Sequence, residues 1–561
     1  MRKALTILLT TALCTNGFAQ LSTHESPISF DYRIGQNLDV GNSVPTVTMP
    51  VLDMETIERE DLADEENGIP PRFGYAHKVN YNINNSGFWQ ELPNGDKLWR
   101  LNVRCPGALS VNFLFDRFWI PAGGKFFIYS SDHNHTIGAF TSRNNKGDSV
   151  NVRGFATELV YGSDVTLEYY QPDYVTEDAI ISIDYIVHGY RFIHFGDRWY
   201  GDAGSCQVNV NCPEGDNWQN EKKAVARIII SNRASTGSLI NTTDLSPKPY
   251  FLTANHCVKR FGDAVNNPNL DYSVFYWNYE CTGCSNNRPT HSFSTSGATI
   301  IANGGPSDFA LLYLTEDPLD NSGYVPYYLG WDRSGSSGTP GVCIHHPMAD
   351  AKKISTVKKQ PTSATYIIED RGHTHWKVYW KQTQNGHGTT EGGSSGAALL
   401  TGTHKVIGQL SGGFSNCDSI NFPDYFGKIS YSWTNGDFYN ERRRLNCWLD
   451  SLNTGEQAIE GLLVIRVDST MNADQQLYSN IRITSTGSLT VQSNIELMGN
   501  SRVIVEPGGV LVIDGGTLSN VELDLKPGAS LQIINNGVIE TRDGFNAPVG
   551  AIVDVDYGQI I

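Results

Sequence analysis

The sequence predicts a mostly β protein with several domains. Charged residues make up only 18% of the 561 residues, whereas glycine occurs 55 times and aromatic residues make up 11%. A typical soluble domain carries about 25% charged residues, aromatic residues favour strands, and glycine favours turns. At roughly 100–200 residues per domain, this length predicts three or four domains, each large enough to bury a core.

The charge balance excludes one broad class of partner. The chain has 42 Lys and Arg against 59 Asp and Glu, a formal net charge of −17, and its pI is near 5.3. Sequence-independent binding of nucleic acid needs a basic surface that displaces phosphate counterions. The sequence contains no cluster of Lys and Arg, so we expect no nucleic-acid partner.

The first residues have the pattern of an export signal. Arg2 and Lys3 precede the apolar run 4–13, and Gly17-Phe18-Ala19 offers a small-x-small cleavage site. The apolar run is shorter than the about 20 residues that a transmembrane helix needs. We expect 1–19 to be a signal peptide and the mature protein to be secreted, with no transmembrane segment. Nine of the ten cysteines would then enter an oxidising compartment, and at least one would lack a partner within the chain.

Two different regions follow the signal. Residues 20–70 are predicted as an acidic linker, because 53–66 carry eight acidic residues against one basic residue. Such a run repels itself and is expected to stay solvated rather than to bind. Residues 71–200 are predicted as an antiparallel β-sandwich, because runs such as 165–169 alternate apolar and polar side chains and turns such as Asn94-Gly95 separate them.

The second half of the chain changes character near residue 463. Residues 201–462 are rich in turns and short strands, with a helix expected over 438–452. In 463–561, apolar pairs recur at intervals of six to ten residues, and Glu506-Pro507-Gly508 returns twenty residues later as Lys526-Pro527-Gly528. Short strands at such a repeat predict a β-solenoid-like region, whose rungs bury their apolar pairs against one another. We expect a spacer without chemistry there.

Three segments of 201–462 together fit one mechanism. His256 follows a strand, Asp308 directly precedes an apolar strand, and Ser395 lies in a loop flanked by glycines. A serine hydroxyl attacks a carbonyl when an imidazole takes its proton, and a carboxylate holds that imidazole in the right tautomer. His256, Asp308 and Ser395 would supply these roles. Gly393 would let its own N–H and that of Ser395 point at the developing oxyanion.

The segment Thr253-Ala254-Asn255-His256-Cys257 is similar to the histidine motif of chymotrypsin-like serine proteases, although that family usually has Ala or His at the position of Asn255. A closer resemblance, covering essentially all of 201–462, is to the secreted bacterial lysyl endopeptidases. Its motifs are Gly204-Ser205-Cys206, Asn211-Cys212-Pro213-Glu214-Gly215-Asp216, Thr236-Gly237-Ser238-Leu239-Ile240-Asn241, Tyr276-Trp277-Asn278-Tyr279, Gly330-Trp331-Asp332-Arg333, Ile344-His345-His346-Pro347 and Gly408-Gln409-Leu410.

The resemblance implies a chymotrypsin-like double β-barrel for 201–462, with 71–200 as its propeptide domain and 463–561 as a variable extension. It places the nucleophile on Ser395, the general base on His256 and the orienting acid on Asp308. Asp424 would be the carboxylate that binds the substrate lysine, because a buried charge without a cation penalises neutral side chains. Ser411, Gly412 and Gly413 would form the edge that pairs with the substrate backbone.

The resemblance also implies two disulfides, Cys206 with Cys417 and Cys212 with Cys284. The partner expected for Cys257 is replaced by Ser235, and Cys281 offers a possible substitute. Cys105, Cys343 and Cys447 have no assignable partner in the sequence. Ser411 stands where lysyl endopeptidases have a histidine. The expected mature start, Gly201, follows Tyr200 rather than lysine, so cleavage by the enzyme itself does not explain processing there.

These features predict a secreted serine endopeptidase that cleaves protein or peptide substrates after Lys, or after Lys and Arg. No cofactor and no metal is expected, because His345-His346 belongs to a structural motif of the resembling family, and His373 and His375 lack further ligands at suitable spacing. The main alternative is a non-catalytic surface adhesin or binding protein on a protease fold, with the C-terminal region attached to the cell surface. A preference for Glu is disfavoured, because Asp424 would repel it.

Overall fold

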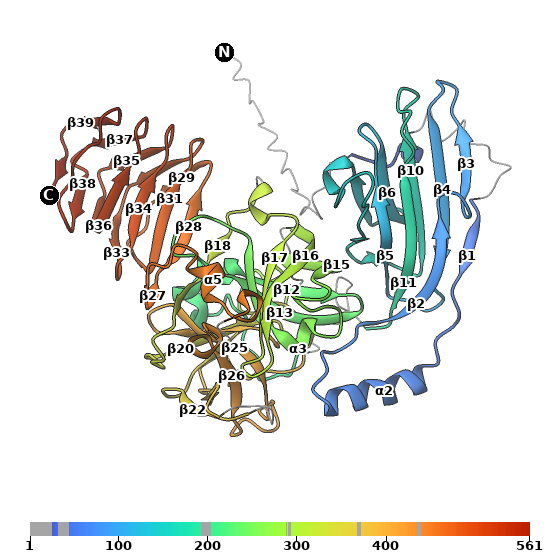
Figure 1. Cartoon of the computed structure of the whole chain (residues 1–561), viewed down its shortest axis with the longest axis horizontal. Coiled ribbons are helices and arrows are strands. Elements are labelled where there is room, and N and C mark those ends of the chain that lie inside the picture. Colours follow the sequence, from blue (N-terminus) through green and yellow to red (C-terminus); the bar gives the residue numbers. More distant parts are fainter. Residues whose placement is uncertain are drawn as a thin grey trace, which may run out of the picture.

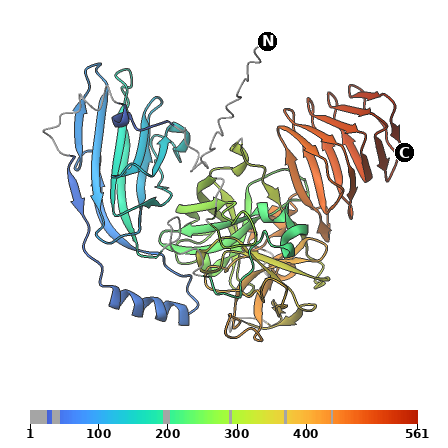
Figure 2. The same cartoon turned by 180° about the vertical axis from the view of Figure 1, so that it is seen from behind.

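The computed structural model describes residues 25–31, 44–191, 203–287, 289, 293–321, 323–366, 372–434 and 439–561. The expected signal peptide and the junction at Tyr200 and Gly201 lie outside these residues. The chain is mostly β, and its described part forms a sandwich, a central protease-like body and a C-terminal stack of strands (Figure 1). Seen from behind, the sandwich and the stack lie on opposite sides of the central body (Figure 2). None of the helices in the described ranges is long and apolar enough to cross a membrane.

The N-terminal sandwich has two sheets around an aromatic core. One sheet has the order β1 (Thr46–Thr48), β4 (Lys97–Arg104), β10 (Asp164–Gln171), β6 (Lys125–Ser130), β7 (Thr136–Phe140), with β3 (Phe88–Glu91) beside β4. The other has the order β2 (Gly74–Asn82), β11 (Ile180–Gly189), β5 (Ser110–Trp119), β8 (Phe155–Ala156), with β9 (Val160–Tyr161) beside β5. Phe115 and Phe126 meet between the sheets with ring centroids 5.8 Å apart, which explains the alternating pattern of these strands.

The acidic run does not behave as the solvated linker expected for it. Residues Met54–Glu66 form the helix α2, and Asp53 caps its start by accepting from Thr56 N and Thr56 Oγ1 at 3.3 and 2.8 Å. Part of the repulsion between its carboxylates is removed by arginines that come from elsewhere in the chain. Figure 1 shows α2 below the sandwich, beside the central body.

The central body contains a closed barrel and a second, largely antiparallel sheet. The barrel consists of β12 (Val225–Ile230), β13 (Arg233–Leu239), β14 (Tyr250–Ala254), β17 (Phe309–Leu314), β16 (Phe293–Gly304) and β15 (Asn269–Trp277). The second sheet has the order β21 (Lys353–Thr356), β20 (Pro340–His345), β24 (Ala398–Thr401), β25 (Lys405–Gly413), β26 (Asp424–Lys428), β23 (His375–Val378), β22 (Thr362–Ala364), and β19 (Gly330–Asp332) and β27 (Ala458–Ile459) extend it from β25. The chymotrypsin-like architecture expected for this region is confirmed.

The helix expected over 438–452 is replaced by two short turns. They are the 3₁₀ turn Glu441–Arg443 and the helical turn α5 (Asn446–Leu449). The backbone between them is drawn to another element, because Leu445 N and Asn446 N donate to the carbonyls of Ser432 and Trp433. These donors are therefore not available to continue one helix.

The C-terminal region is a stack of parallel strands, as predicted. One face has the order β29 (Asp468–Met471), β32 (Ser488–Val491), β35 (Val510–Asp514), β37 (Ser530–Ile534), β39 (Ile552–Val555). A second ladder joins β28 (Gly461–Ile465), β31 (Ser479–Ile483), β34 (Arg502–Val505) and β36 (Thr517–Leu525), and a third joins β30 (Gln475–Leu477), β33 (Asn494–Leu497), β36, β38 (Val538–Thr541) and β40 (Gln559–Ile560). The apolar residues stack in register, as Leu489, Leu511 and Leu531 do. The repeated Pro-Gly turns also stack, with Gly508 N donating to Gly528 O.

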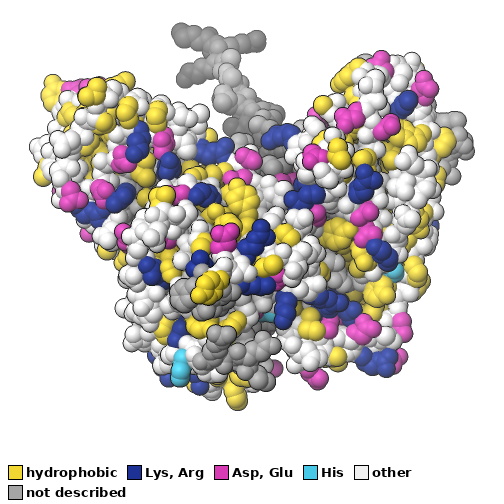
Figure 3. Space-filling view, viewed as in Figure 1, with side chains coloured by type: hydrophobic (Ala, Val, Ile, Leu, Met, Phe, Trp, Pro, Cys, Tyr) yellow, Lys and Arg dark blue, Asp and Glu magenta, His cyan; other side chains and the backbone are white. Residues whose placement is uncertain are grey.

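The sandwich is packed tightly against the barrel. Phe73, Leu114 and Val187 share one buried cluster with Ile229 and Val274. Polar contacts join the same bodies: Lys146 Nζ donates to Ser296 Oγ at 2.8 Å, and Arg153 forms an ion pair with Asp271 at 2.6 Å. Elsewhere, acidic and basic side chains are interspersed over the face shown in Figure 3.

Candidate active site

His256 and Asp308 meet at one end of the barrel. His256 lies in the short helix α3 (Asn255–Val258) after β14, and Asp308 directly precedes β17. Asp308 Oδ2 lies 2.7 Å from His256 Nδ1, and Asp308 Oδ1 accepts from His256 N at 2.9 Å. Asp308 has a φ of +55°, a left-handed conformation that Asp tolerates better than most residues. The sequence alone did not indicate this turn, which directs the carboxylate toward the histidine.

The environment of His256 shifts its proton affinity. Burial favours the neutral imidazole, but the neighbouring Cys257 and Asp308 outweigh it and raise the pKa of His256 well above its usual value. Cys257 Sγ lies 3.7 Å from His256 Nε2. In the described part of the chain, no hydrogen bond joins this nitrogen to Ser395 Oγ. A general base in this arrangement would have to release the Cys257 contact before it took a proton from a serine.

Ser395 lies in a tight loop at the start of the path into β24. Gly393 and Gly396 on either side have φ values of +90° and +87°, which only glycine adopts without strain. A Cβ on Gly393 would lie 2.9 Å from Ala349 N and His346 O. Within the described ranges, the N–H groups of Gly393 and Ser395 have no hydrogen-bond acceptor. Two unpaired N–H groups beside a serine are what an oxyanion requires.

Asp424 is fully buried at the start of β26. Its carboxylate accepts from Trp380 Nε1 and Thr390 Oγ1 at 2.6 Å, from Ser415 Oγ at 2.5 Å and from Ser415 N at 3.1 Å. Burial raises the pKa of Asp424 even though these donors oppose the rise. The donors therefore do not fully compensate the buried charge. Sequence reasoning had found Asp424 but not Thr390, Ser415 or Trp380, which surround it.

Ser411, Gly412 and Gly413 continue β25 along the rim of the site. Ser411 Oγ lies 3.1 Å from His375 Nε2. His375 Nδ1 in turn lies 2.8 Å from Thr374 Oγ1, which donates to Pro306 O. Because Thr374 Oγ1 gives its hydrogen to Pro306 O, it accepts from His375 Nδ1–H, and His375 Nε2 therefore accepts from Ser411 Oγ–H. The sequence had assigned no role to His375.

No grouping of His, Cys, Asp and Glu suited to a metal ion occurs in the described ranges.

Ser395, Thr390 and the 411–415 rim line a cavity of about 580 Å³. Part of its wall comes from residues 61–72, the end of α2 and the turn after it, which we call the covering segment. The covering segment pairs with the barrel edge as an antiparallel strand would. Ala234 N donates to Pro71 O at 3.0 Å, and Phe73 N donates to Asn232 O at 3.0 Å. Peptide backbone from the N-terminal region therefore already occupies one side of the cleft.

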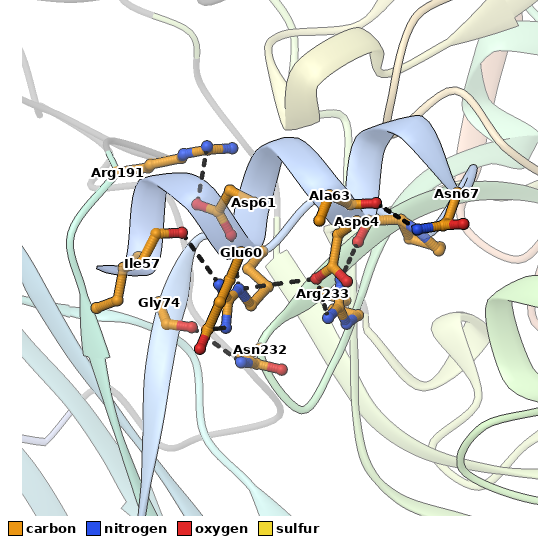
Figure 4. A network of polar contacts seen from close by, with 12 residues as sticks. Ile57, Glu60, Asp61, Ala63, Asp64, Asn67, Gly74, Arg191, Asn232 and Arg233 are labelled. Atoms are coloured by element: carbon orange, nitrogen blue, oxygen red, sulfur yellow. Dashed lines mark hydrogen bonds and ion pairs between the residues drawn. The ribbon is translucent and has the colours of Figure 1, made fainter. Parts of the chain in front are cut away.

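Ion pairs hold the covering segment in place (Figure 4). Asp61, whose side chain is 7% exposed, accepts from Arg72 Nε at 2.6 Å and from Arg191 at 2.9 Å. Asp64 accepts from Arg233 at 2.6 Å, and Arg233 also donates to Pro70 O at 2.6 Å. In Figure 4, Asp61 and Asp64 point away from α2 toward arginines from separate parts of the chain. No sequence signal linked these acids to their partners.

The cysteines near the site follow the resemblance in part. Cys206 is joined to Cys417, and Cys212 to Cys284. The bridge considered between Cys257 and Cys281 is not formed, because both are free and Cys281 Sγ donates to Asn287 O at 3.2 Å. Cys105, Cys343 and Cys447 are also free.

Several known proteases resemble parts of this chain. Residues 200–427 match the family model described as lysyl endopeptidase, C-terminal domain. The lysyl endopeptidase of Pseudomonas aeruginosa is 27% identical over 414 residues, which cover 71% of this chain and 80% of that protein. Among solved structures, a Glu endopeptidase in complex with MPD is 17% identical, covering 41% of this chain and 94% of its own, with a TM-score of 0.25. The active form of the Rv3671c protease from M. tuberculosis is 16% identical, covering 42% and 87%, with a TM-score of 0.25.

The fold and the match over 200–427 define the protein as a peptide hydrolase, a serine endopeptidase of the chymotrypsin class. Within that class the chain is similar to lysyl endopeptidases, by the family model over residues 200–427 and by the relative from Pseudomonas aeruginosa.

Proposed function

We propose that the protein is a secreted endopeptidase that cleaves after lysine, or after lysine and arginine, through an acyl-enzyme on Ser395. The observation that carries the proposal is the 2.7 Å contact between His256 Nδ1 and Asp308 beside the Ser395 loop. His256 would take the proton of Ser395 through Nε2 as Oγ attacks the scissile carbonyl. Asp308 would hold the ring and stabilise the imidazolium.

The remaining steps follow from the same residues. The Gly393 and Ser395 N–H groups would receive the oxyanion of the tetrahedral intermediate. Removal of one such donor typically costs about 3–4 kcal/mol of transition-state stabilisation. His256 would return the proton to the leaving amine, and a water activated by His256 would then release the acyl group. Ser411, Gly412 and Gly413 would pair with the substrate backbone on the acyl side.

Asp424 supports the preference for a basic residue. It lies behind the hydroxyls of Thr390 and Ser415, which line the cavity. A lysine ammonium that contacts these hydroxyls would supply the positive charge that the buried carboxylate lacks. A neutral side chain would leave that charge uncompensated, and a glutamate would add a second negative charge.

The covering segment supports synthesis as a latent precursor. Its backbone pairing at Ala234 and Asn232 takes up the barrel edge beside the Ser395 loop. An extended substrate needs that side of the cleft, so residues 61–72 would have to leave or be cut away before long peptides enter. The signal pattern of 1–19 supports export before activation.

The proposal is tested with peptides that carry Lys, Arg, Glu or Leu before the scissile bond. We expect the processed protein to cleave the Lys peptide, and the Arg peptide to a lesser or equal extent. Ser395→Ala should abolish cleavage, and Asp424→Asn should lower kcat/KM for Lys by about thirtyfold or more, because truncation of one partner of a buried charge pair costs about 2–5 kcal/mol. Asp418→Asn, an exposed acid nearby, is the matched control.

Two results would redirect the proposal. Equal cleavage of the Leu and Lys peptides would refute the role given to Asp424. Absence of any Ser395-dependent cleavage, with the processed protein folded, would favour a binding protein or adhesin that keeps a protease fold. N-terminal sequencing of the protein from the culture medium tests export, since a protein retained in the cytoplasm would contradict it.

A further inference from the structure

His345, the last residue of β20, lies completely buried beneath the loop that carries Ser395. Its Nδ1 is 2.8 Å from Ser394 Oγ, and its Nε2 is 3.0 Å from Ser355 Oγ. Ser394 and Ser355 are themselves fully buried. The three side chains form one continuous chain of hydrogen bonds that reaches both ends of the 389–395 loop.

The direction of every hydrogen bond in this chain can be assigned. Ser355 Oγ donates its hydrogen to Thr389 O at 3.0 Å, so it accepts from His345 Nε2–H. The neutral ring then has an unprotonated Nδ1, which accepts from Ser394 Oγ–H. Ser394 Oγ in turn accepts from Glu391 N at 3.1 Å. Every polar atom of the chain is satisfied in this single arrangement.

His345 stays neutral across the working range of a protease. Burial, with a further contribution from the nearby Lys353 charge, lowers the pKa of His345 to about 3. The acceptor at Nδ1 and the donor at Nε2 therefore keep their identities at any pH at which His256 could act as a base.

The two ends of this hydrogen-bond chain lie beside two functional parts of the site. Ser394 immediately precedes Ser395, and its bond from Glu391 N closes the turn that contains Gly393. Thr389 immediately precedes Thr390, which contacts Asp424 in the specificity pocket. The His345 ring therefore supports the turn before Ser395 through Nδ1, and the backbone beside the specificity pocket through Nε2. Neither contact uses a charged group or a chain terminus.

We propose that His345 is a positioning residue that fixes the 389–395 loop in its reactive shape, with Ser394 aligning the oxyanion donors and Ser355 aligning the pocket wall. All of these hydrogen bonds are present in the uncut chain, so the loop is formed before any cleavage. The inference rests on the proposed function, because it assumes that Ser395 is the nucleophile.

The Ser394 end and the Ser355 end of this hydrogen-bond chain can be tested separately. Ser394→Ala removes the hydroxyl on the nucleophile side, and we expect kcat to fall at least about tenfold while KM stays within about twofold. Ser355→Ala removes the brace on the pocket side, and we expect KM to rise about tenfold with kcat within about threefold. A lysine boronate, which needs the oxyanion donors, should lose affinity in the first variant. A small cation that fills only the pocket should lose affinity in the second.

Substitutions of the histidine itself provide the cross-check. His345→Gln keeps an N–H toward Ser355 and loses the acceptor for Ser394, so it should resemble Ser394→Ala. His345→Asn keeps an acceptor toward Ser394 and loses the donor, so it should resemble Ser355→Ala. If His345 had a purely structural role, all four variants would have a lower unfolding midpoint, and kcat and KM would not be affected separately in the two pairs.

The control is Ser273→Ala, which removes another fully buried hydroxyl, bonded to Leu270 O in the barrel. It should leave kcat, KM and boronate affinity unchanged. Wild-type kcat and boronate affinity in Ser394→Ala, in an enzyme whose cleavage depends on Ser395, would overturn the inference and leave the proposed function intact. Absence of Ser395-dependent cleavage in the wild type would overturn both.

Discussion

Neutralising Asp61 should open the cleft of the uncut chain. The carboxylate is 7% exposed and accepts from Arg72 at 2.6 Å, Tyr190 at 2.8 Å and Arg191 at 2.9 Å. Asp61→Asn has nearly the same shape and keeps one acceptor, but it removes the charge. Arg72 also keeps its contact to Glu60 at 3.0 Å, so the covering segment is weakened rather than unfolded.

The size of the effect follows from these contacts. A hydrogen bond to a charged group contributes about 1.5–3 kcal/mol. Arg191 is 35% exposed, so water replaces much of what it loses. A net loss equivalent to one such bond, about 2 kcal/mol, raises the population of the open form roughly thirtyfold.

The assay is the initial rate at which the uncut chain cleaves a lysine peptide that extends several residues beyond the scissile bond. Such a peptide needs the side of the cleft that the covering segment occupies. We expect Asp61→Asn to be roughly thirtyfold faster than the wild type. Glu58→Gln, an exposed residue of α2, should change the rate less than twofold, because a surface charge without a buried partner contributes little. Equal rates for all three proteins would refute the idea that these ion pairs keep the cleft covered.

Three further predictions concern other buried groups. Cys257→Ala should shift the acid limb of the kcat/KM profile to lower pH, because Cys257 contributes to the raised pKa of His256; an unchanged limb would contradict this. Burial lowers the pKa of His188 from about 6.5 to about 4. As pH falls through this range, the unfolded state binds a proton before the folded state does, so the free energy of unfolding decreases. Calorimetry should show that the decrease in unfolding free energy between pH 6.5 and 4 is smaller in His188→Gln, by up to about 3 kcal/mol. The same pH dependence in both proteins would refute this role of His188. Lys146→Met should leave the buried Glu316 carboxylate without its cation. Once the junction between them has been cut, the sandwich should therefore bind the protease about 3 kcal/mol more weakly. Gel filtration that shows equally stable complexes would contradict this.

Local pattern made the solenoid and the segments of the site predictable. The apolar pairs of 463–561 recur because each rung rests on the previous one, so the repeat in the sequence is the repeat in space. His256, Asp308 and Ser395 each lie beside a strand end that the sequence displays. The glycines beside Ser395 also indicated where the backbone had to turn.

The remainder depends on contacts between distant residues. The acidic run looked self-repelling because Arg191 and Arg233, which neutralise Asp61 and Asp64, lie far along the chain. His345 lies 49 positions from Ser394. It belongs to a motif shared with lysyl endopeptidases, but nothing in that motif indicates its contact with the Ser395 loop. The expected helix over 438–452 failed for the same reason, since its backbone donors are taken by a separate turn.

The C-terminal stack starts on a strand of the protease itself. β18 (Tyr327–Tyr328), which lies in the sequence between strands of the barrel and those of the second sheet, pairs with β28, and the parallel ladder continues from there. The five strands of one face, spaced by about 4.8 Å, extend over about 19 Å. A peptide tether would let the cleft turn freely. Here hydrogen-bonded strands join the stack to the protease, so a contact at the outermost rung would bias the direction in which the cleft faces and the nearby chains that it reaches.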